Sequence, residues 1–242
     1  MDVREKMRNE VKEDRNMERI ILVEASVDYT YQIEQFRREV FEYDPDDGNR
    51  FAGCMSFEEV NSAEAWINMC RLRKSEATCK QGSVDVPSHT YFAIRKHDNR
   101  LVGIIDLRHH INHPILGTWG GHCGYTVRPC ERGKGYAKEM LRLNIQNAEN
   151  MGIEKLLVTC YPDNKASEKV ILANGGIYEK TVVVDGQEIK RYWIDVIFNL
   201  KHNIWIVTTC NYSPDFVTFA PDVQLNDAPK MHPICTRKIQ IV

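Results

Sequence analysis

The residues with the most specific chemistry lie where a predicted strand ends at Val127 and a predicted helix begins a few residues later. The run RGKGYA (132–137) opens that helix. A helix N-terminus leaves backbone N–H groups without partners and carries a partial positive charge. Glycines let an anion approach those N–H groups closely. The segment is therefore predicted to hold a diphosphate group.

Three kinds of glycine-rich loop bind such groups, and the spacing separates them. A P-loop needs G-x-x-x-x-G-K-[ST], but Lys134 is followed by Gly135. A dinucleotide-binding G-x-G-x-x-G would start at Gly133 and would place Lys138 where the third glycine belongs. The loop that binds the diphosphate of an acyl-CoA fits the run.

Three segments, in the right order, resemble the GNAT superfamily of N-acetyltransferases. RGKGYA (132–137) is similar to its Arg/Gln-x-x-Gly-x-Gly/Ala loop, and Val127-x-Pro129 resembles the lead-in to that loop. DNKASEKVILANGGI (163–177) is similar to its Asn-x-x-Ala/Ser…Gly segment. The order of predicted elements agrees over residues 19–196. The wider sequence resembles a group of uncharacterised predicted acetyltransferases in this superfamily.

The resemblance implies an α/β (α+β) fold with a mixed, largely antiparallel central sheet flanked by helices, in which strands 4 and 5 are parallel and splayed apart. Acetyl-CoA would be the acyl donor, with no metal, and its pantetheine arm would lie in the gap as an added strand. The implied donor-binding residues lie on the strand edge, the loop and the next helix: Tyr125, Thr126, Val127, Arg132, Gly133, Lys134, Gly135, Tyr136, Ala137, Asn164 and Ser167.

Direct transfer to a primary amine in a ternary complex needs a base or a water relay, and a hydrogen-bond donor for the thioester oxygen. Backbone N–H groups near Val127 are the candidate donors. The candidate bases are His122, Tyr125 and Asp106, with His122 first because it titrates nearest to neutral pH.

The proton donor to the departing thiolate is less clear. Many members of the superfamily place a tyrosine seven residues after the position of Asn164, where this chain has Ile171. Tyr161, Tyr178 and Ser167 remain open as substitutes. A non-catalytic acyl-CoA-binding or regulatory module, or a transferase with another acyl donor, stays an alternative.

The acceptor site is expected between helices 29–43 and 57–74 and the loop 108–120. Acidic residues in the first helix and the turn after it favour, weakly, a cationic acceptor: Glu34, Glu39, Asp44, Asp46 and Asp47. Arg128, Glu131 and Lys138 are interpreted as surface charges.

Length and composition bound these interpretations. The chain has 242 residues, with 32 Lys plus Arg against 34 Asp plus Glu, so no nucleic-acid partner is expected. No apolar run has the roughly 18 residues of a membrane span, and the charged N-terminus is unlike a signal peptide. A cytoplasmic protein with reduced thiols is expected, because no secretory signal is found and the chain is long enough to fold without disulfides. No two cysteines have the C-x-x-C spacing of a zinc or redox motif.

The elements that must position the site follow from apolar periodicity. Asp28 is predicted to cap the helix 29–43, and Ser56 with Glu59 forms a predicted capping box for the helix 57–74. The other predictions are strands 20–24, 90–96, 100–110, 118–127 and 154–160, helices 133–150 and 164–174, and a hairpin 177–184/187–197 with an Asp185-Gly186 turn.

Histidines 109, 110 and 113 are not expected to bind metal, because adjacent strand residues face opposite ways. The predicted organisation is a charged lead at 1–18, a catalytic domain at 19–196 and an extension at 197–242. A strand in that extension would either cover the sheet edge or complete a homodimer.

Overall fold

The first of two sheets has the strand order β1-β2-β3-β4, with each strand antiparallel to its neighbour. In the computed structural model, which describes residues 18–44, 50–80 and 86–196, these strands are Ile20–Glu24, Ser88–Arg95, Arg100–Arg108 and Tyr125–Val127. Successive β2 side chains point to opposite faces. Tyr91 joins one buried cluster and Phe92 the other, so both faces of the sheet are buried.

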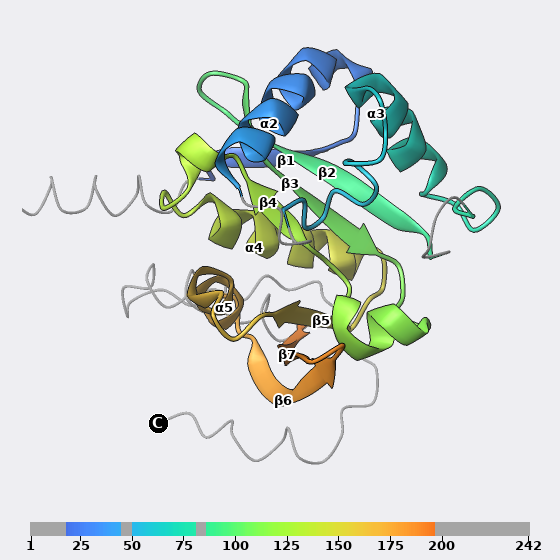
Figure 1. Ribbon diagram of the computed structural model, residues 1–242, viewed down its shortest axis with the longest axis vertical. Coiled ribbons are helices and arrows are strands. Elements are labelled where there is room, and N and C mark those ends of the chain that lie inside the picture. The colour runs from blue at the N-terminus through green and yellow to red at the C-terminus, as the bar shows by residue number, and fades with distance from the viewer. Residues whose placement is uncertain (1–17, 45–49, 81–85, 197–242) are drawn as a thin grey trace, which may run out of the picture. The chain divides into compact units, whose positions relative to one another are not determined.

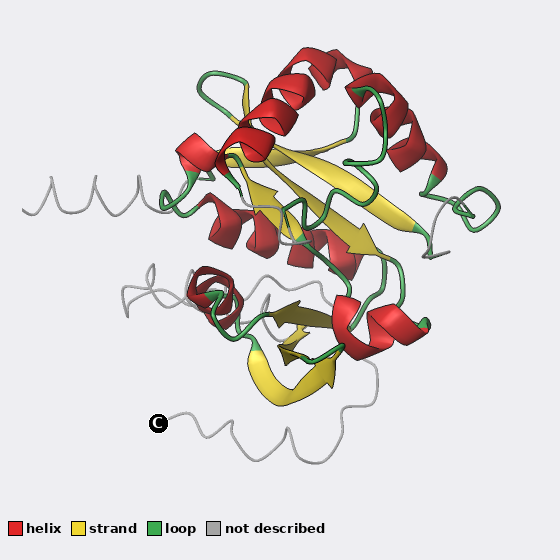
Figure 2. Cartoon of the chain, viewed as in Figure 1, coloured by secondary structure: helices red, strands yellow, loops and turns green. Residues whose placement is uncertain are grey.

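Helices cover both faces of this sheet (Figure 1, Figure 2). The helices α2 (Thr30–Tyr43) and α3 (Ala63–Leu72) pack on one face, with Phe36 and Trp66 fully buried. The helix α4 (Tyr136–Asn150) covers the other face, with Met140 fully buried. The sheet between these helices carries β4 at its edge, next to the glycine loop that opens α4.

The second sheet has the order β5-β7-β6, again antiparallel throughout. Its strands are Lys155–Cys160, Gln187–Asp195 and Ile177–Val184, and α5 (Lys165–Leu172) follows β5. In the described part of the chain no strand pairing joins β4 to β5. The predicted mixed fold, with an antiparallel sheet flanked by helices and a break between strands 4 and 5, is confirmed.

The terminal hairpin forms as predicted. β6 and β7 are joined by Asp185 and Gly186, whose φ angles are +50° and +80°. Two consecutive positive φ angles are typical of a type I′ turn, in which Gly and Asp or Asn are favoured.

The helix predicted at 29–43 forms at Thr30–Tyr43, but its predicted cap and the predicted start of α3 were wrong. A short 3₁₀ turn, Val27–Tyr29, precedes α2, and the side chain of Ser26 caps that turn by accepting from the N–H of Asp28. α3 begins at Ala63, and Ser62 caps it by accepting from the N–H of Ala65. Ser56 instead has a φ of +59° in the preceding turns.

The predicted strand 118–127 was also wrong, because only Tyr125–Val127 is a strand and Leu116–Gly120 forms a π-helical turn. The carbonyls of residues 117–121 accept hydrogen bonds from side chains instead of a neighbouring strand. Arg191 donates to the first two, Thr159 to the third and Arg108 to the last two. The predicted helix 133–150 begins later, at Tyr136, because Gly133 and Gly135 have positive φ angles that a right-handed helix does not contain.

All described residues belong to the first of two units of the chain, Met1–Ile204 and Trp205–Val242. The expected charged lead, apart from Glu18, and the expected extension 197–242 lie outside the described residues. No helix in the described ranges is long and apolar enough to cross a membrane.

Candidate active site

A cavity of about 790 Å³ opens where β4 and β5 separate. Its walls include the three β4 residues, the end of β5, the glycine loop and the first turns of α5. Ala52 and Gly53, from the connection between α2 and α3, close another side. The cavity therefore touches most of the segments that the sequence assigned to an acyl-CoA.

One edge of β4 faces this cavity with its backbone. The carbonyl of Gly124 accepts from the N–H of Asp106 at 3.1 Å, and the N–H of Arg128 donates to Val102 at 2.9 Å. Gly124 and Arg128 flank β4 and bond to β3. Because backbone bonding alternates along a strand, the N–H and C=O groups of Tyr125 and Val127 point away from β3. These two residues line the cavity, as predicted for the edge to which a pantetheine arm would add.

Thr126 differs from its two neighbours. It is paired with Ile104 of β3, and its hydroxyl donates to the carbonyl of Ala52 at 2.8 Å. Thr126 borders the cavity, but both its backbone and its hydroxyl have partners in the protein. We therefore remove it from the predicted set of donor ligands and treat it as a support for the wall.

The glycine loop has the geometry of an anion site. Gly133 and Gly135 have φ angles of +75° and +85°, a left-handed conformation that favours glycine. Gly135 is the N-cap of the 15-residue α4, and no side chain in the described ranges caps the helix there. The N–H groups from Gly133 to Ala137 are therefore positioned where the helix dipole also favours an anion.

Arg132 lines the cavity, but its donors have partners within the protein. Its N–H donates to the carbonyl of Pro129 at 3.3 Å. Its guanidinium pairs with both carboxylate oxygens of Asp44 at 2.5 Å, and its Nε donates to the carbonyl of Val127 at 3.0 Å. Arg132 therefore joins the end of α2 to the end of β4, and its donors are already used.

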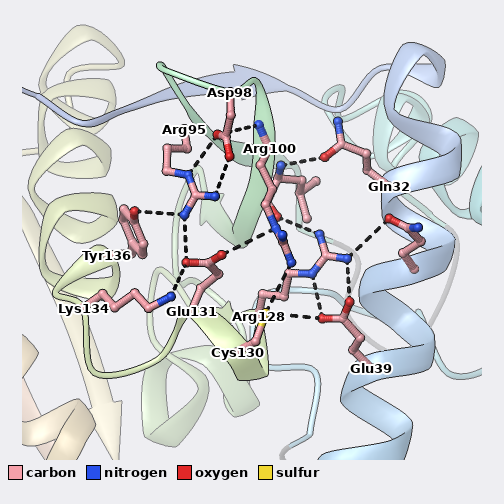
Figure 3. A network of polar contacts seen from close by, with 12 residues as sticks. Gln32, Glu39, Arg95, Asp98, Arg100, Arg128, Cys130, Glu131, Lys134 and Tyr136 are labelled. Atoms are coloured by element: carbon pink, nitrogen blue, oxygen red, sulfur yellow. Dashed lines mark hydrogen bonds and ion pairs between the residues drawn. The ribbon is translucent and has the colours of Figure 1, made fainter.

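Two residues interpreted as surface charges are buried. Arg128 and Glu131 each keep only 3% of their surface exposed. Arg128 forms two hydrogen bonds to Glu39, at 2.7 and 2.6 Å, and Glu131 accepts from Lys134 at 2.9 Å (Figure 3). Lys138 is exposed, as interpreted. The predicted donor ligand Lys134 thus has its ammonium on a carboxylate of its own loop.

Tyr136 opens α4 as a buried anchor. Its hydroxyl accepts from Nη1 of Arg95 at 3.3 Å, and the guanidinium of Arg19 lies 4.8 Å from the centre of its ring. Only its backbone N–H, in the first turn of the helix, remains a candidate donor to a ligand.

Asn164 and Ser167 line the cavity from the start of α5. The side chain of Asn164 caps that helix by accepting from the N–H of Ser167 at 3.0 Å. Across the cavity, the hydroxyls of Tyr125 and Ser167 lie 2.8 Å apart. Burial raises the pKa of Tyr125 well above its ordinary value, so this phenol stays protonated near neutral pH.

The usual tyrosine position of the superfamily is part of the core here. Ile171 is fully buried, and Gly176 packs so closely on it that an added Cβ would lie 2.4 Å from the Ile171 Cγ2 atom. Of the proposed substitutes, Tyr161 lines the cavity. Tyr178 does not line it, and its hydroxyl bonds to that of Thr181 on the same strand at 2.9 Å.

His122 holds the two sheets together and does not line the cavity. The backbone N–H of His122 donates to the carbonyl of Leu157 at 2.8 Å, and the Nδ1 atom of its ring accepts from the backbone N–H of Leu157 at 2.8 Å. Burial, with help from the charge of Arg108, lowers the pKa of His122 to about 4. The prediction of His122 as the leading base is therefore withdrawn.

Asp106 is likewise outside the cavity lining. It is 2% exposed, its Oδ1 accepts from the N–H of Gly124 at 2.6 Å, and its Oδ2 lies 2.9 Å from Nη2 of Arg108. Burial raises the pKa of the Asp106 carboxyl. Its contacts give it a supporting role for the start of β4, instead of the predicted role of base.

Three of the five acidic residues that suggested a cationic acceptor have partners inside the protein. Glu34 accepts from the N–H of Ala63 at 2.6 Å, which helps to cap α3. Glu39 pairs with Arg128, and Asp44 pairs with Arg132. Asp46 and Asp47 lie outside the described residues. Glu34, Glu39 and Asp44 therefore give no support for a cationic acceptor.

Several cavity-lining residues were not singled out from the sequence, among them Ala52, Gly53 and Thr159, whereas Arg108 and Trp119 lie in the loop 108–120 that was expected at the acceptor site. Gly53 was the detectable one, because a glycine often marks a close backbone approach. A Cβ on Gly53 would lie 2.2 Å from the carbonyl oxygen of Gly124. Arg108 and Trp119 carry no local pattern that separates them from their neighbours.

The described histidines and cysteines form no metal cluster. Among residues 18–44, 50–80 and 86–196, no group of three or more His, Cys, Asp or Glu side chains is arranged to hold a metal ion. His109 instead lies within hydrogen-bond distance of His89, 2.8 Å from ring nitrogen to ring nitrogen. Cysteines at 54, 70, 79, 123, 130 and 160 are free thiols.

Solved structures share this fold. RimL, a ribosomal L7/L12 alpha-N-protein acetyltransferase in complex with coenzyme A, aligns with a TM-score of 0.51 at 16% identity over 74% of this chain and 95% of its own. MccE, a microcin C7 self-immunity acetyltransferase in complex with acetyl-CoA and AMP, aligns with a TM-score of 0.50 at 15% identity, covering 74% and 93%.

A chimera of the Vibrio cholerae spermidine N-acetyltransferase SpeG with hSSAT aligns with a TM-score of 0.50 at 13% identity, covering 75% and 98%. At such identities these likenesses establish the fold alone. A search among curated proteins finds no match.

The sequence model of the acetyltransferase (GNAT) domain matches residues 19–177, which is more than half of the chain. The protein is therefore a member of the GNAT acetyltransferase family, and an acyltransferase enzyme.

Proposed function

We propose that the protein transfers the acetyl group of acetyl-CoA to a primary amine by direct attack within a ternary complex. One observation carries the proposal: a single cavity joins an edge of β4 to the N-terminus of α4, and among the described residues no strand pairs with that edge and no side chain caps that helix end. A strand edge suits an amide-containing arm, and a helix N-terminus suits a diphosphate. Coenzyme A has both groups in one molecule.

The proposed donor ligands are the parts of the predicted set whose donors remain available. Backbone groups of Tyr125 and the N–H of Val127 would pair with the pantetheine arm. The loop N–H groups from Gly133 to Ala137 would hold the diphosphate, and the side chains of Asn164 and Ser167 would border the arm from α5. The fit is supported by family members such as RimL and MccE, which have this fold and bind coenzyme A or acetyl-CoA.

Transfer from a thioester to an amine forms a C–N bond and breaks a C–S bond. The amine loses one proton, and the sulfur leaves as a thiolate that can take one. We assign the proton donor to the Tyr125–Ser167 hydroxyl pair, because it lies in the cavity and its phenol is protonated near neutral pH. In this proposal the pair donates the proton that a tyrosine at the position of Ile171 would donate in many members of the superfamily.

The proposed hydrogen-bond donor to the thioester oxygen is the backbone of β4 near Tyr125 and Val127. Tyr161 is the remaining candidate from the predicted set to assist the amine, and water is the other route, because neither His122 nor Asp106 reaches the cavity. For the acceptor, relatives modify a protein N-terminus or spermidine. We extend to this chain only the shared chemistry, a primary amine.

The test is thiol release from acetyl-CoA in the presence of an amine panel that holds amino acids, polyamines, N-terminal peptides and lysine peptides. Mass spectrometry of the amine would identify the acetylated product. Turnover on one class supports the proposal and names the acceptor. Coenzyme A binding without turnover on any amine, or turnover only with longer acyl donors, would favour the alternatives. Absence of coenzyme A binding would overturn the site assignment.

A further inference from the structure

A buried carboxylate lies beside the glycine loop, surrounded by three cations (Figure 3). The side chain of Glu131 is 4% exposed. Its Oε2 lies 2.9 Å from Nη1 of Arg95 and 2.9 Å from Nζ of Lys134, and its Oε1 lies 3.5 Å from Nε of Arg100. The cations come from β2, β3 and the loop, so Glu131 ties the loop to the β2–β3 hairpin.

The hydrogen bonds around Glu131 extend to both ends of the loop. Before it, Arg128 is held by Glu39 of α2 and donates to the carbonyl of Leu101 at 3.2 Å. After it, Arg95 also donates to the hydroxyl of Tyr136, the first residue of α4. The segment from Arg128 to Tyr136 is thus anchored at its start, middle and end, as Figure 3 shows.

Simple electrostatics makes Glu131 an unfavourable neighbour for the ligand. It lines the cavity, and like charges repel. Burial works to raise the pKa of Glu131, but the Lys134 hydrogen bond and the charge of Arg95 outweigh it and hold the pKa below its ordinary value. The residue is therefore an anion next to a site that, on the proposed function, receives a diphosphate.

We propose that Glu131 is a positioning residue for donor binding, and that its negative charge makes binding of the anionic donor stronger. The inference rests on the proposed function. Gly133 and Gly135 give the loop a large conformational freedom, which would be lost on binding. By drawing Arg95, Arg100 and Lys134 to one point, Glu131 fixes the loop before the ligand arrives and lowers that entropy cost.

Preorganisation outweighs repulsion for a geometric reason. Three cations within 3.5 Å neutralise the carboxylate, so little of its field reaches the ligand. Without it, of these three cations only Arg95 keeps a carboxylate partner among the described residues, Asp98, at 2.6 Å. Arg100 and Lys134 lose theirs, and the exposed Lys134 would move away with its part of the loop. The loop would then lose the arrangement of its N–H groups.

The experiment measures coenzyme A binding by calorimetry to the full chain and to Glu131→Gln. The control is Glu154→Gln, the same change of charge at an exposed residue beyond the other end of α4. We expect Glu131→Gln to weaken binding about tenfold or more, the order of a ~1.4 kcal/mol loss, and Glu154→Gln to match the wild type. Binding by Glu131→Gln that equals or exceeds the wild type would overturn the inference, whereas a wild type that binds no coenzyme A would instead refute the proposed function.

A second ligand separates positioning from general destabilisation. Acetyl-pantetheine lacks the diphosphate, so ligand-detected NMR should find its affinity unchanged by Glu131→Gln. An equal loss for both ligands would mean that the whole cavity is disturbed, and would overturn the positioning role. Glu131→Asp keeps the charge and should bind coenzyme A with intermediate affinity. If Glu131→Gln does not fold, Glu131→Asp carries the same two-ligand comparison.

Discussion

Asp106 and Gly124 exchange two hydrogen bonds: the N–H of Asp106 donates to the carbonyl of Gly124 at 3.1 Å, and the N–H of Gly124 donates to Oδ1 of Asp106 at 2.6 Å. Both backbone groups of Gly124 are thereby fixed by one residue. The backbone carbonyl of Asp106 also accepts a hydrogen bond from Nδ2 of Asn144 in α4 at 3.0 Å. The start of β4 and the helix that bears the glycine loop are therefore held to the same point on β3.

The first prediction concerns Asp106. Asp106→Ala leaves Arg108 as a buried unpaired charge and should lower the free energy of unfolding by about 3–5 kcal/mol, measured by urea denaturation. In Asp106→Asn the side-chain oxygen can still accept from Gly124. Asp106→Asn/Arg108→Gln also removes the unpaired charge, so the double variant should recover part of the lost stability, but not the part that the Arg108 hydrogen bonds to Gly120 and Gly121 contribute. If Asp106→Asn kept wild-type stability but lost the rise of activity with pH that a catalytic base produces, Asp106 would again be the candidate base.

The second prediction compares two glycines at opposite ends of α4. Gly135 precedes the helix with a φ of +85°, and Gly152 follows it with a φ of +72°. An alanine at either site should cost about 1–2 kcal/mol of stability because of its left-handed backbone. Only Gly135→Ala should weaken coenzyme A binding, and Gly135→Val should abolish it. Equal affinities of the Gly135→Ala and Gly152→Ala variants in calorimetry would contradict the loop assignment.

The parts of the site that were predictable are those written in consecutive residues. The loop from Gly133 to Ala137 and the Asp185-Gly186 turn combine special backbone angles with residues that favour them, so local sequence is sufficient. The capping box at Ser56 failed because Ser62 offers an equally good cap six residues later. The choice between them depends on where Trp66 packs, which local sequence does not contain.

The supporting contacts were not predictable because they join distant segments. Arg128 and Glu131 look like solvated charges beside an exposed loop, and only the fold brings Glu39, Arg95 and Arg100 to them. The same holds for His122. Its residue type suggests a base near neutral pH, but the backbone of Leu157 occupies its Nδ1 and burial lowers its pKa.

The third prediction concerns the hydroxyl pair. Tyr125→Phe and Ser167→Ala remove one hydroxyl each and should lower kcat by roughly 10²-fold, within the usual range for proton transfer by a side chain. The dissociation constant for coenzyme A should stay near that of the wild type, because the backbone contacts remain. Tyr178→Phe removes a hydroxyl outside the cavity and is the matched control. Unchanged kcat in both cavity variants would exclude the pair as proton donor.

The fourth prediction concerns stability as a function of pH. The pKa of His122 is about 4 in the folded chain and about 6.5 in an unfolded one. Between these values the unfolded chain binds more protons, so the stability contributed by neutral His122 is complete above pH 6.5 and is lost as the pH falls toward 4, by at most about 3 kcal/mol. Urea denaturation at several pH values between 4 and 7 would measure this slope.

His122→Asn isolates this effect, because the Asn side-chain oxygen can accept the N–H of Leu157 without titrating. Burial also lowers the pKa of His89 and His109, so the variant should flatten the slope and not remove it. His97 is an exposed histidine with 73% of its side chain accessible, and His97→Asn should leave the slope as it is. A slope that is the same in His122→Asn and the wild type would mean that the pKa of His122 does not differ between the folded and the unfolded chain, and that His122 is still available for proton transfer near neutral pH.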